Sequence, residues 1–408
     1  MINNTDIHII AASEEIKDKT PAELNEELTI LSGKFGGTCY AKEGYETIKQ
    51  QPVEKAIKRA ENTAKNGHHS VYQHAMVTME IQCSKILAML LNSIGVSNTS
   101  EKSARYTKMK PQSELEEQLY YKWHDIFANL IKKEYADKFT EKEIDKLAFE
   151  NARYMISVFT PTSMVYSLPF RNIFYVIDWA ESMEKNLPNI KGDFNQRLKE
   201  EVNGLRLELL KIVGNKHNFH DNKNEYFRFM PMQATGMKED DSKEIYGDVY
   251  TSNYLASFAC VAQEQRHRTL RIKINFSGDD AGEYGFYVPL LIRKYNMEEE
   301  WLSDLGLVKD VYPQATLLYV TEQGIFEDFA LKCKERMCGR AQLEIMNLNA
   351  WMTEEFIAHK EELSNANRKR LENMITVDGK PCARCNFKDF ECQEGCKWGP
   401  YGALGRLI

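Results

Sequence analysis

The order of elements in the first half of this chain returns in the second half after a period of about 170 residues. In each half an apolar helix leads into a polar motif, and a helical block and a long helix follow. The motifs differ, because the first half carries Glu101–Tyr106 (EKSARY) and the second carries Gln263–Arg268 (QEQRHR). A period of this length is that of a whole domain rather than of a solenoid repeat. The sequence therefore predicts two diverged copies of one domain.

Composition restricts the class of protein. The chain has 408 residues, of which 43% are apolar and 28% are charged, so two or three domains could each bury a core. The net charge of −7 is spread without long single-sign blocks, which argues against general affinity for nucleic acid or an anionic membrane. No apolar run approaches the roughly 20 residues that span a bilayer. Met1–Asp6 lacks the basic start of a secretory signal, so we expect a cytoplasmic location.

The predicted fold class is α+β, with two repeats in which helices pack on a small sheet, and a small cysteine-rich module at the C-terminal end. The expected boundaries are 1–195 for the N-terminal repeat, 196–370 for the C-terminal repeat and 371–408 for the tail. Residues 214–250 are polar and irregular, which indicates an insertion or a boundary.

Local patterns predict individual elements. Val77–Cys83 alternates between apolar and polar residues, as a half-buried strand does, and Ser84 is placed to cap the next helix. Trp123 starts a helical spacing of apolar residues, and a further helix is expected at 196–213. A second apolar helix is predicted from Tyr254 into the arginine triplet of the second motif.

A long helix is predicted from about Phe326 to Met352. Arg336, Arg340 and Glu344 lie four residues apart within it and would share one face. An ion pair between Arg340 and Glu344 would be a sufficient structural explanation of those two residues. Arg336 has no such obvious partner one turn ahead, but Glu335 and Asp328 could still satisfy it.

Both polar motifs contain side chains that suit phosphate. Arginine forks bind phosphate oxygens bidentately and an imidazole suits an adjacent polar ring, so Arg266, His267 and Arg268 point to an anionic ligand. The Ser103 hydroxyl and the Arg105 guanidinium, two residues apart, can converge on one phosphate in the same way. Two structural alternatives stay open here. Basic side chains at a helix end complement the helix dipole, and the serine and arginine fit a solvated loop.

Two groups of residues have the side chains of metal ligands. The tail contains four closely spaced cysteines, Cys382, Cys385, Cys392 and Cys396. Four thiolates in a short, turn-rich segment are typical of a structural zinc site, with an iron–sulfur cluster, free thiols or a redox pair as alternatives. His68, His69 and His74 lie around Ser70, but their spacing matches no compact zinc motif, and core histidines are common.

Together these residues resemble the flavin-dependent thymidylate synthases, the ThyX family. The family signature is an RHR triplet followed by Ser-x-Arg, with a GHxSxxEH segment before it. Gly67–His74 (GHHSVYQH) resembles that segment, with Gln73 where glutamate is usual, and Glu101–Tyr106 resembles the end of the signature. Arg153 and Arg171 are similar to two later arginines of the family.

The second half resembles the complementary part of the family pattern. Gln263–Arg268 looks like an intact QxxRHR, and Arg336–Ile345 (RMCGRAQLEI) resembles the end of the family fold. Ser93–Gly95 stands where the first half would carry RHR, and Phe276–Gly278 has no arginine where the second half would carry Ser-x-Arg. The resemblance covers most of 30–185 and 250–350, and it implies one kind of site divided between the two halves.

The resemblance implies a role for each motif residue. The residues implied to hold FAD are Arg266, His267, Arg268, Ser70 and Arg171. The residues implied to hold a dUMP-like nucleotide are Gln263, Ser103, Arg105, Arg153 and Arg336, with His68 near the folate side. Glu101 would lie beside the nucleotide, and the catalytic residues would be Arg336, Arg105 and Glu101.

The implied activity is methylation of dUMP at C5, with methylenetetrahydrofolate as carbon donor, NADPH as reductant and FAD as hydride carrier. Two alternatives remain open: C5 modification of another pyrimidine nucleotide, and a nucleotide- and flavin-binding relative without catalysis. Family sites form between the subunits of a homotetramer. A duplicated chain would therefore act as a homodimer that mimics the tetramer. The resemblance does not cover the tail, where zinc is expected from the cysteine spacing alone.

Overall fold

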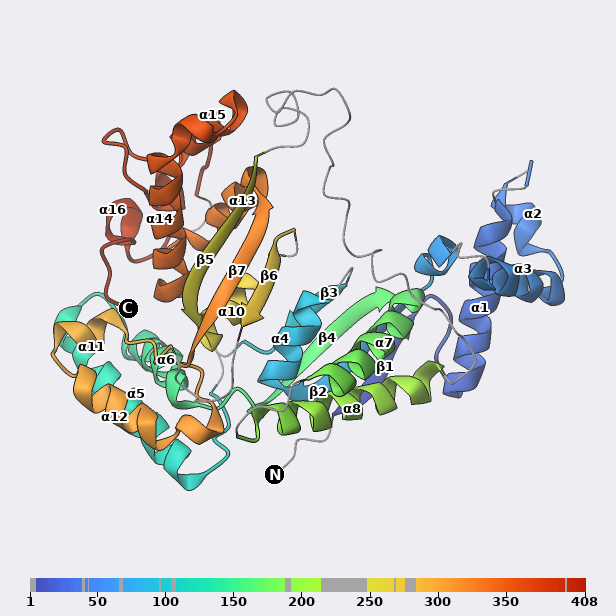
Figure 1. Ribbon diagram of the computed structural model, residues 1–408, viewed down its shortest axis with the longest axis horizontal. Helices are drawn as coiled ribbons and strands as arrows, with labels where there is room; N and C mark the ends of the chain where they lie inside the picture. The colour runs from blue at the N-terminus through green and yellow to red at the C-terminus, as the bar shows by residue number, and fades with distance from the viewer. Residues whose placement is uncertain are drawn as a thin grey trace. The chain divides into compact units, whose positions relative to one another are not determined.

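The computed structural model describes residues 5–38, 41–42, 44–65, 69–94, 97–103, 108–187, 192–213, 248–267, 269–275, 284–392 and 395–408. The chain divides into two compact units that alternate along the sequence. The first unit comprises residues 1–102 and 161–228, and the second comprises residues 103–160 and 229–408. Each unit combines helices with a small antiparallel sheet, so the predicted α+β class is confirmed (Figure 1).

The first unit contains a four-stranded sheet of order β1-β2-β4-β3. Its strands are β1 (Asp6–Ala12), β2 (Met76–Ser84), β3 (Asn98–Glu101) and β4 (Pro161–Pro169). Its helices are α1 (Pro21–Gly37), α2 (Tyr45–Lys49), α3 (Val53–Lys65), the 3₁₀ turn η2 (His69–Gln73), α4 (Lys85–Ser93), α7 (Phe170–Asn186) and α8 (Phe194–Val213).

The second unit contains a three-stranded sheet of order β5-β7-β6. Its strands are β5 (Val249–Ser257), β6 (Arg271–Asn275) and β7 (Leu317–Ile325). Its helices before the last strand are α5 (Glu114–Glu134), α6 (Glu141–Ala152), η3 (Arg153–Met155), α10 (Phe258–Glu264), α11 (Leu290–Lys294), α12 (Glu298–Leu307) and η4 (Lys309–Val311). Those after it are α13 (Phe326–Arg336), α14 (Leu343–Ala358), η5 (Lys360–Glu362), α15 (Asn365–Asn373), η6 (Arg384–Asn386) and α16 (Gly399–Gly402).

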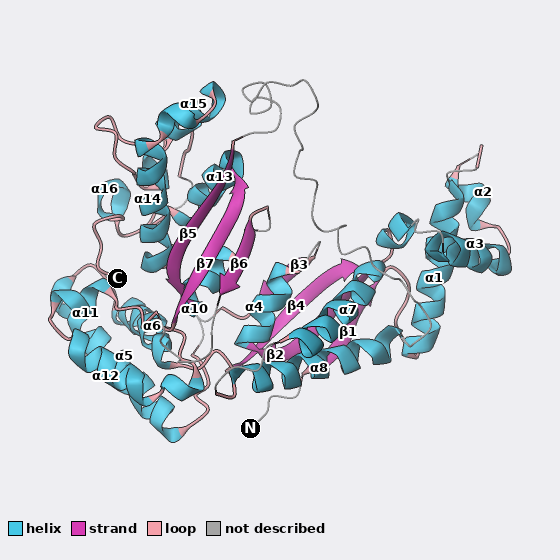
Figure 2. Cartoon of the chain, in the orientation of Figure 1, coloured by secondary structure: helices cyan, strands magenta, loops and turns pink. Residues whose placement is uncertain are grey.

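One face of each sheet is buried under helices. In the first unit Val77, Met79 and Ile81 of β2 are fully buried, and α4, α7 and α8 pack against the sheet (Figure 2). In the second unit Leu318 and Val320 of β7 are fully buried, and α10 and α13 pack beside β5 and β7. The alternation of buried and exposed residues along these strands is the period of two expected of a half-covered sheet.

The two sheets share topology and register. β2 pairs antiparallel with β4 over nine residues, ending with Ser84 opposite Pro161, and β5 pairs with β7 over nine residues, ending with Ser257 opposite Leu317. A third strand, β3 or β6, pairs with the other side of β4 or β7. β2 and β5 each end at a serine whose hydroxyl caps the next helix, α4 or α10. This correspondence agrees with the predicted duplication, which stays a prediction, as do the predicted domain boundaries.

Several predicted elements of the first half are confirmed. The strand predicted over Val77–Cys83 is β2, and the Ser84 hydroxyl accepts a hydrogen bond from the Leu87 amide at 3.2 Å at the start of α4. The helices expected around Trp123 and over 196–213 are α5 and α8. Most of the polar segment 214–250 lies outside the described residues. No helix in the described ranges is long and apolar enough to cross a bilayer.

The apolar helix predicted from Tyr254 into the arginine triplet is wrong. Val249–Ser257 form strand β5, and the helix α10 covers only Phe258–Glu264. Leu255 is 47% exposed between the buried residues Tyr254 and Ala256, which is the alternation of a strand. The helix begins where the Ser257 side chain accepts a hydrogen bond from the Cys260 amide, because a serine at this position satisfies a free N–H of the first turn.

The single long helix predicted from Phe326 to Met352 is also wrong. It is two helices, because α13 ends at Arg336 and α14 begins at Leu343. Arg340 lies in the connection between them, where its guanidinium donates to the Gly395 carbonyl at 3.2 Å. Arg336, Arg340 and Glu344 therefore do not share one helix face, and the carboxylate of Glu344 has other partners.

Candidate functional site

A hydrogen-bond network centred on Gln342 joins three segments of the second unit. The Gln342 side-chain carbonyl accepts hydrogen bonds from Arg153 Nη2 and from Gln263 Nε2. Its amide nitrogen donates to the Tyr154 hydroxyl. Arg153 and Tyr154 lie in η3, Gln263 lies in the last turn of α10, and Gln342 precedes α14. The network therefore brings together two residues that the family pattern assigns to a nucleotide, Arg153 and Gln263.

Glu344 connects this network to the start of α10. The Tyr154 hydroxyl donates to its Oε2 at 2.8 Å. The Ser257 backbone amide and hydroxyl donate to its two oxygens at 2.8 and 2.6 Å. Burial raises the pKa of Glu344, and these hydrogen bonds oppose that increase. Glu344 thus fixes the helix that carries Gln263, and the predicted pairing of Glu344 with Arg340 is replaced by these contacts.

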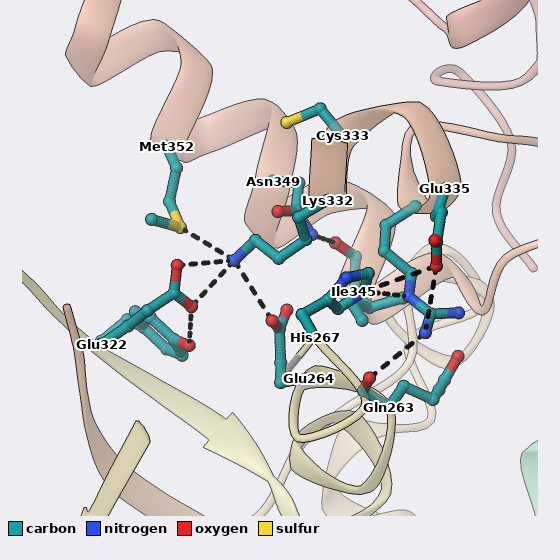
Figure 3. Close-up of polar contacts among 12 residues, drawn as sticks. Gln263, Glu264, His267, Glu322, Lys332, Cys333, Glu335, Ile345, Asn349 and Met352 are labelled. Carbon is teal, nitrogen blue, oxygen red and sulfur yellow. Dashed lines mark hydrogen bonds and ion pairs between the residues drawn. The ribbon is translucent and has the colours of Figure 1, made fainter. Parts of the chain in front are cut away.

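Arg336 lies beside His267 and Gln263 at the end of α13. Its Nε donates to His267 Nε2 at 2.8 Å, and its Nη2 donates to the Gln263 carbonyl at 3.3 Å (Figure 3). Burial and the positive charges of Arg336 and Lys332 lower the pKa of His267 to about 2. The imidazole is therefore neutral, and its Nε2 is an acceptor, so the geometry assigns the ring proton to Nδ1.

Two buried polar atoms of this site have no hydrogen-bond partner among the described residues. They are the side-chain oxygen of Gln263 and Nε of Arg153. Buried polar groups are nearly always paired, so an acceptor and a donor without partners at one place fit a polar ligand. A cavity of about 40 Å³ lined by Tyr154, Gln342 and Glu344 adjoins the network. This volume holds about one water molecule, so the cavity is not itself large enough for a nucleotide.

The other predicted site residues are placed as follows. Arg266 is exposed directly after α10, and Ser103 is half-buried at the start of the second unit. Ser70 is exposed in η2, and Arg171 is buried in the first turn of α7, both in the first unit. The predicted residues that lie outside the described residues are His68, Arg105 and Arg268.

Glu101 lies in the first unit in a buried ion pair. Its Oε1 pairs with Lys85, and its Oε2 accepts a hydrogen bond from the Asn92 side chain at 3.1 Å. Thr99 donates to Asn92 at 2.6 Å and completes the group. These contacts are a sufficient structural reason for a carboxylate at this position, so a role beside the nucleotide stays a prediction.

The predicted metal site in the tail is not supported. Across the described ranges, no group of three or more His, Cys, Asp or Glu side chains is arranged to hold an ion. Cys382 is buried and its thiol donates to the Met374 carbonyl at 3.2 Å, whereas Cys392 is exposed. Cys385 interacts electrostatically with Cys392 and Cys396, so these thiols lie near one another, and zinc in the tail stays a prediction.

Sequence reasoning missed three residues of the network: Tyr154, Gln342 and Glu344. Tyr154 follows a predicted arginine, and the other two lie in the segment Arg336–Ile345 that resembles the end of the family fold. The sequence did offer one signal for these residues, which is that they lie beside or within segments that resemble the family. Their partners are 79 to 190 positions away in the sequence, so no local pattern could identify the contacts.

Residues 29–184 match the family model described as thymidylate synthase complementing protein. The resemblance to the ThyX enzymes is therefore confirmed over this segment, which is less than half of the chain. The matched segment includes Arg153 and Arg171. None of the curated proteins matches the chain.

Two solved structures show a distant likeness. One is the flavin-dependent thymidylate synthase ThyX from Helicobacter pylori complexed with FAD and dUMP, with 16% identity and a TM-score of 0.31 over 52% of this chain and 96% of that chain. The other is the UMP/dUMP methylase PolB from Streptomyces cacaoi bound with 5-Br dUMP, with 11% identity and a TM-score of 0.29 over 52% of this chain and 91% of that chain.

Proposed function

We propose that this chain is a flavin-dependent enzyme that transfers a one-carbon unit to C5 of a uridine monophosphate, with dUMP as the first substrate to test. The observation that carries the proposal is the convergence of Arg153, Gln263 and Arg336 in the second unit. These residues come from three separate segments, and each was assigned to the nucleotide from its motif alone. The family match over residues 29–184 supports the same reading.

The chemistry of these side chains suits a uracil ring. The partnerless oxygen of Gln263 can accept a hydrogen bond, and Nε of Arg153 can donate one, which is the pairing that a ring with alternating N–H and C=O groups requires. Guanidinium groups held near the ring oxygens stabilise the negative charge that develops when C5 becomes nucleophilic. Gln342 holds the side chains of Arg153 and Gln263 together in the absence of a ligand.

Reduced FAD would supply the hydride that completes the transferred carbon as a methyl group. The residues proposed to hold it in the described part of the chain are Arg266, His267, Ser70 and Arg171. The neutral imidazole of His267 has its Nε2 occupied by Arg336, so the Nδ1–H is the group left to donate to a ligand. We further propose NADPH as reductant, methylenetetrahydrofolate as carbon donor, and a homodimer as the active assembly.

The test is release of tritium from C5-tritiated dUMP by the FAD-loaded protein with methylenetetrahydrofolate and NADPH. Transfer replaces the C5–H bond by a C5–C bond and sends the proton to water, so we expect tritium in water and dTMP in equal amounts. Arg153→Ala should abolish release, whereas Arg293→Ala, at an exposed arginine on α11, should not. Parallel reactions with UMP test a different pyrimidine nucleotide. Binding of dUMP without any tritium release would contradict the proposed enzymatic activity and favour a nucleotide-binding protein without catalysis.

A further inference from the structure

A fully buried lysine lies one helical turn before Arg336. The Lys332 ammonium contacts Glu322 Oε1 and Oε2, both at 2.8 Å, and Glu264 Oε2 at 3.1 Å (Figure 3). Met352 Sδ lies 3.8 Å from the same ammonium. The side chains of Lys332, Glu264 and Glu322 are all 0% exposed. We call these three residues the lysine cluster.

The two carboxyl groups of the lysine cluster have unequal surroundings. Glu322 Oε1 accepts a hydrogen bond from the Tyr250 hydroxyl at 2.6 Å, and its Oε2 accepts one from the Tyr254 hydroxyl at 2.7 Å. With Lys332 shared between its oxygens, Glu322 has the donors that an ionised carboxylate requires. Glu264 has only Lys332, and its Oε1 makes no hydrogen bond within the described part of the chain.

Charge balance separates the two groups further. One ammonium and two carboxylates would leave one excess negative charge within the lysine cluster, in a site without solvent, which is unfavourable. Burial and the neighbouring Glu322 raise the pKa of Glu264, while Lys332 and Arg336 oppose the increase. The other titratable groups that interact with Glu264 are Tyr250, Tyr254, Cys260 and Cys333.

The lysine cluster also fixes the candidate site. Glu264 is the last residue of α10 and directly follows Gln263, and its carbonyl accepts the His267 amide at 3.0 Å. Lys332 lies on α13, the helix that ends at Arg336. A contact between Glu264 and Lys332 therefore sets the distance between the helix that carries Gln263 and the helix that carries Arg336.

We propose that Glu264 is a protonated, neutral carboxyl group that acts through Lys332 as a positioning residue for Gln263, His267 and Arg336. The positioning role rests on the proposed function, because it concerns the site for the nucleotide. The protonation state does not, because it can be measured without any ligand. A purely structural ion cluster is the competing account, and it would require an ionised Glu264.

The first experiment measures thermal unfolding of the wild type, Glu264→Gln and the matched variant Glu322→Gln between about pH 5 and pH 8. An amide reproduces a neutral acid, so Glu264→Gln should melt within a degree or two of the wild type near pH 5. Glu322→Gln removes an ionised partner of Lys332 and should melt far lower at every pH. A loss of folding in Glu264→Gln equal to that in Glu322→Gln would overturn the neutral state.

The pH dependence gives a second readout. A raised pKa means that the folded protein keeps a proton which the unfolded chain releases above about pH 4.5, so stability falls as pH rises through the folded value. The melting temperature of the wild type should therefore fall relative to that of Glu264→Gln as the pH rises. A constant difference between the two proteins across this range would contradict a titrating Glu264.

The positioning role is tested by dUMP affinity, measured by calorimetry on the FAD-loaded protein. Glu264→Gln should keep the wild-type affinity near pH 7, and Glu264→Ala, which removes the contact with Lys332, should weaken it about tenfold. Equal affinity in Glu264→Ala and the wild type would overturn the positioning role. Failure of the wild type itself to bind dUMP would refute the proposed function instead, and the unfolding experiments would still test the protonation state.

Discussion

Replacement of Gln342 by leucine tests whether the network holds the site together. The change keeps the side-chain volume close but removes the acceptor for Arg153 and Gln263 and the donor for Tyr154. Tyr154 keeps its bond to Glu344, and Gln263 keeps a 3.4 Å contact with a backbone carbonyl. The main cost therefore falls on the buried guanidinium of Arg153, and we expect a loss of about 3 kcal/mol in the free energy of unfolding.

The assay is urea unfolding. If the free energy of unfolding falls with urea concentration at the same slope in each variant, a change in the midpoint reports a change in stability. The control is Gln265→Leu, the same substitution at a buried glutamine whose side-chain oxygen makes no hydrogen bond among the described residues. That variant should change the free energy of unfolding by less than about 1 kcal/mol. Gln342→Leu should also weaken dUMP binding. Equal losses of stability in Gln342→Leu and Gln265→Leu would refute the claim that the network holds the site together.

Three further predictions concern single residues. Burial raises the pKa of Glu201 from 4.5 to about 7. As pH rises through this range, the free energy of unfolding of the wild type should fall by about 3 kcal/mol relative to that of Glu201→Gln, as urea unfolding at each pH would measure. Ser257→Ala removes the cap of α10 and one hydrogen bond to Glu344, and should cost about 2 kcal/mol in urea unfolding. Arg153→Lys keeps the charge but loses the planar fork, and should weaken dUMP about tenfold by calorimetry, which unchanged affinity would contradict.

The parts of the fold that local patterns determine were predictable from the sequence. The alternation of Val77–Cys83 predicted β2, and Ser84 predicted the start of α4, because both signals act over a few residues. The equivalent serine, Ser257, was missed because the apolar run continues across the change from strand to helix without a turn. The break between Arg336 and Leu343 was missed because residues within it make contacts far along the chain, as Arg340 does with the Gly395 carbonyl.

The sequence could predict several residues of the candidate site, but it could not predict the contacts between them. Motif resemblance selected Arg153, Gln263 and Arg336, which the second unit brings together. It could not select Gln342, because its role depends on partners distant in sequence. Nothing in a sequence marks Lys332 as buried either, since lysines are rarely fully buried without partners that only the fold supplies.

The central claim is that a pyrimidine nucleotide binds beside a flavin at the Arg336 site. The most direct measurement is the visible absorbance spectrum of the FAD-loaded protein during titration with dUMP, repeated for Arg336→Ala and for the control Arg293→Ala. We predict a saturable change in the flavin bands for the wild type and the control, and its loss in Arg336→Ala. A spectrum that dUMP leaves unchanged in the wild type, or that changes equally in Arg336→Ala, would contradict the claim.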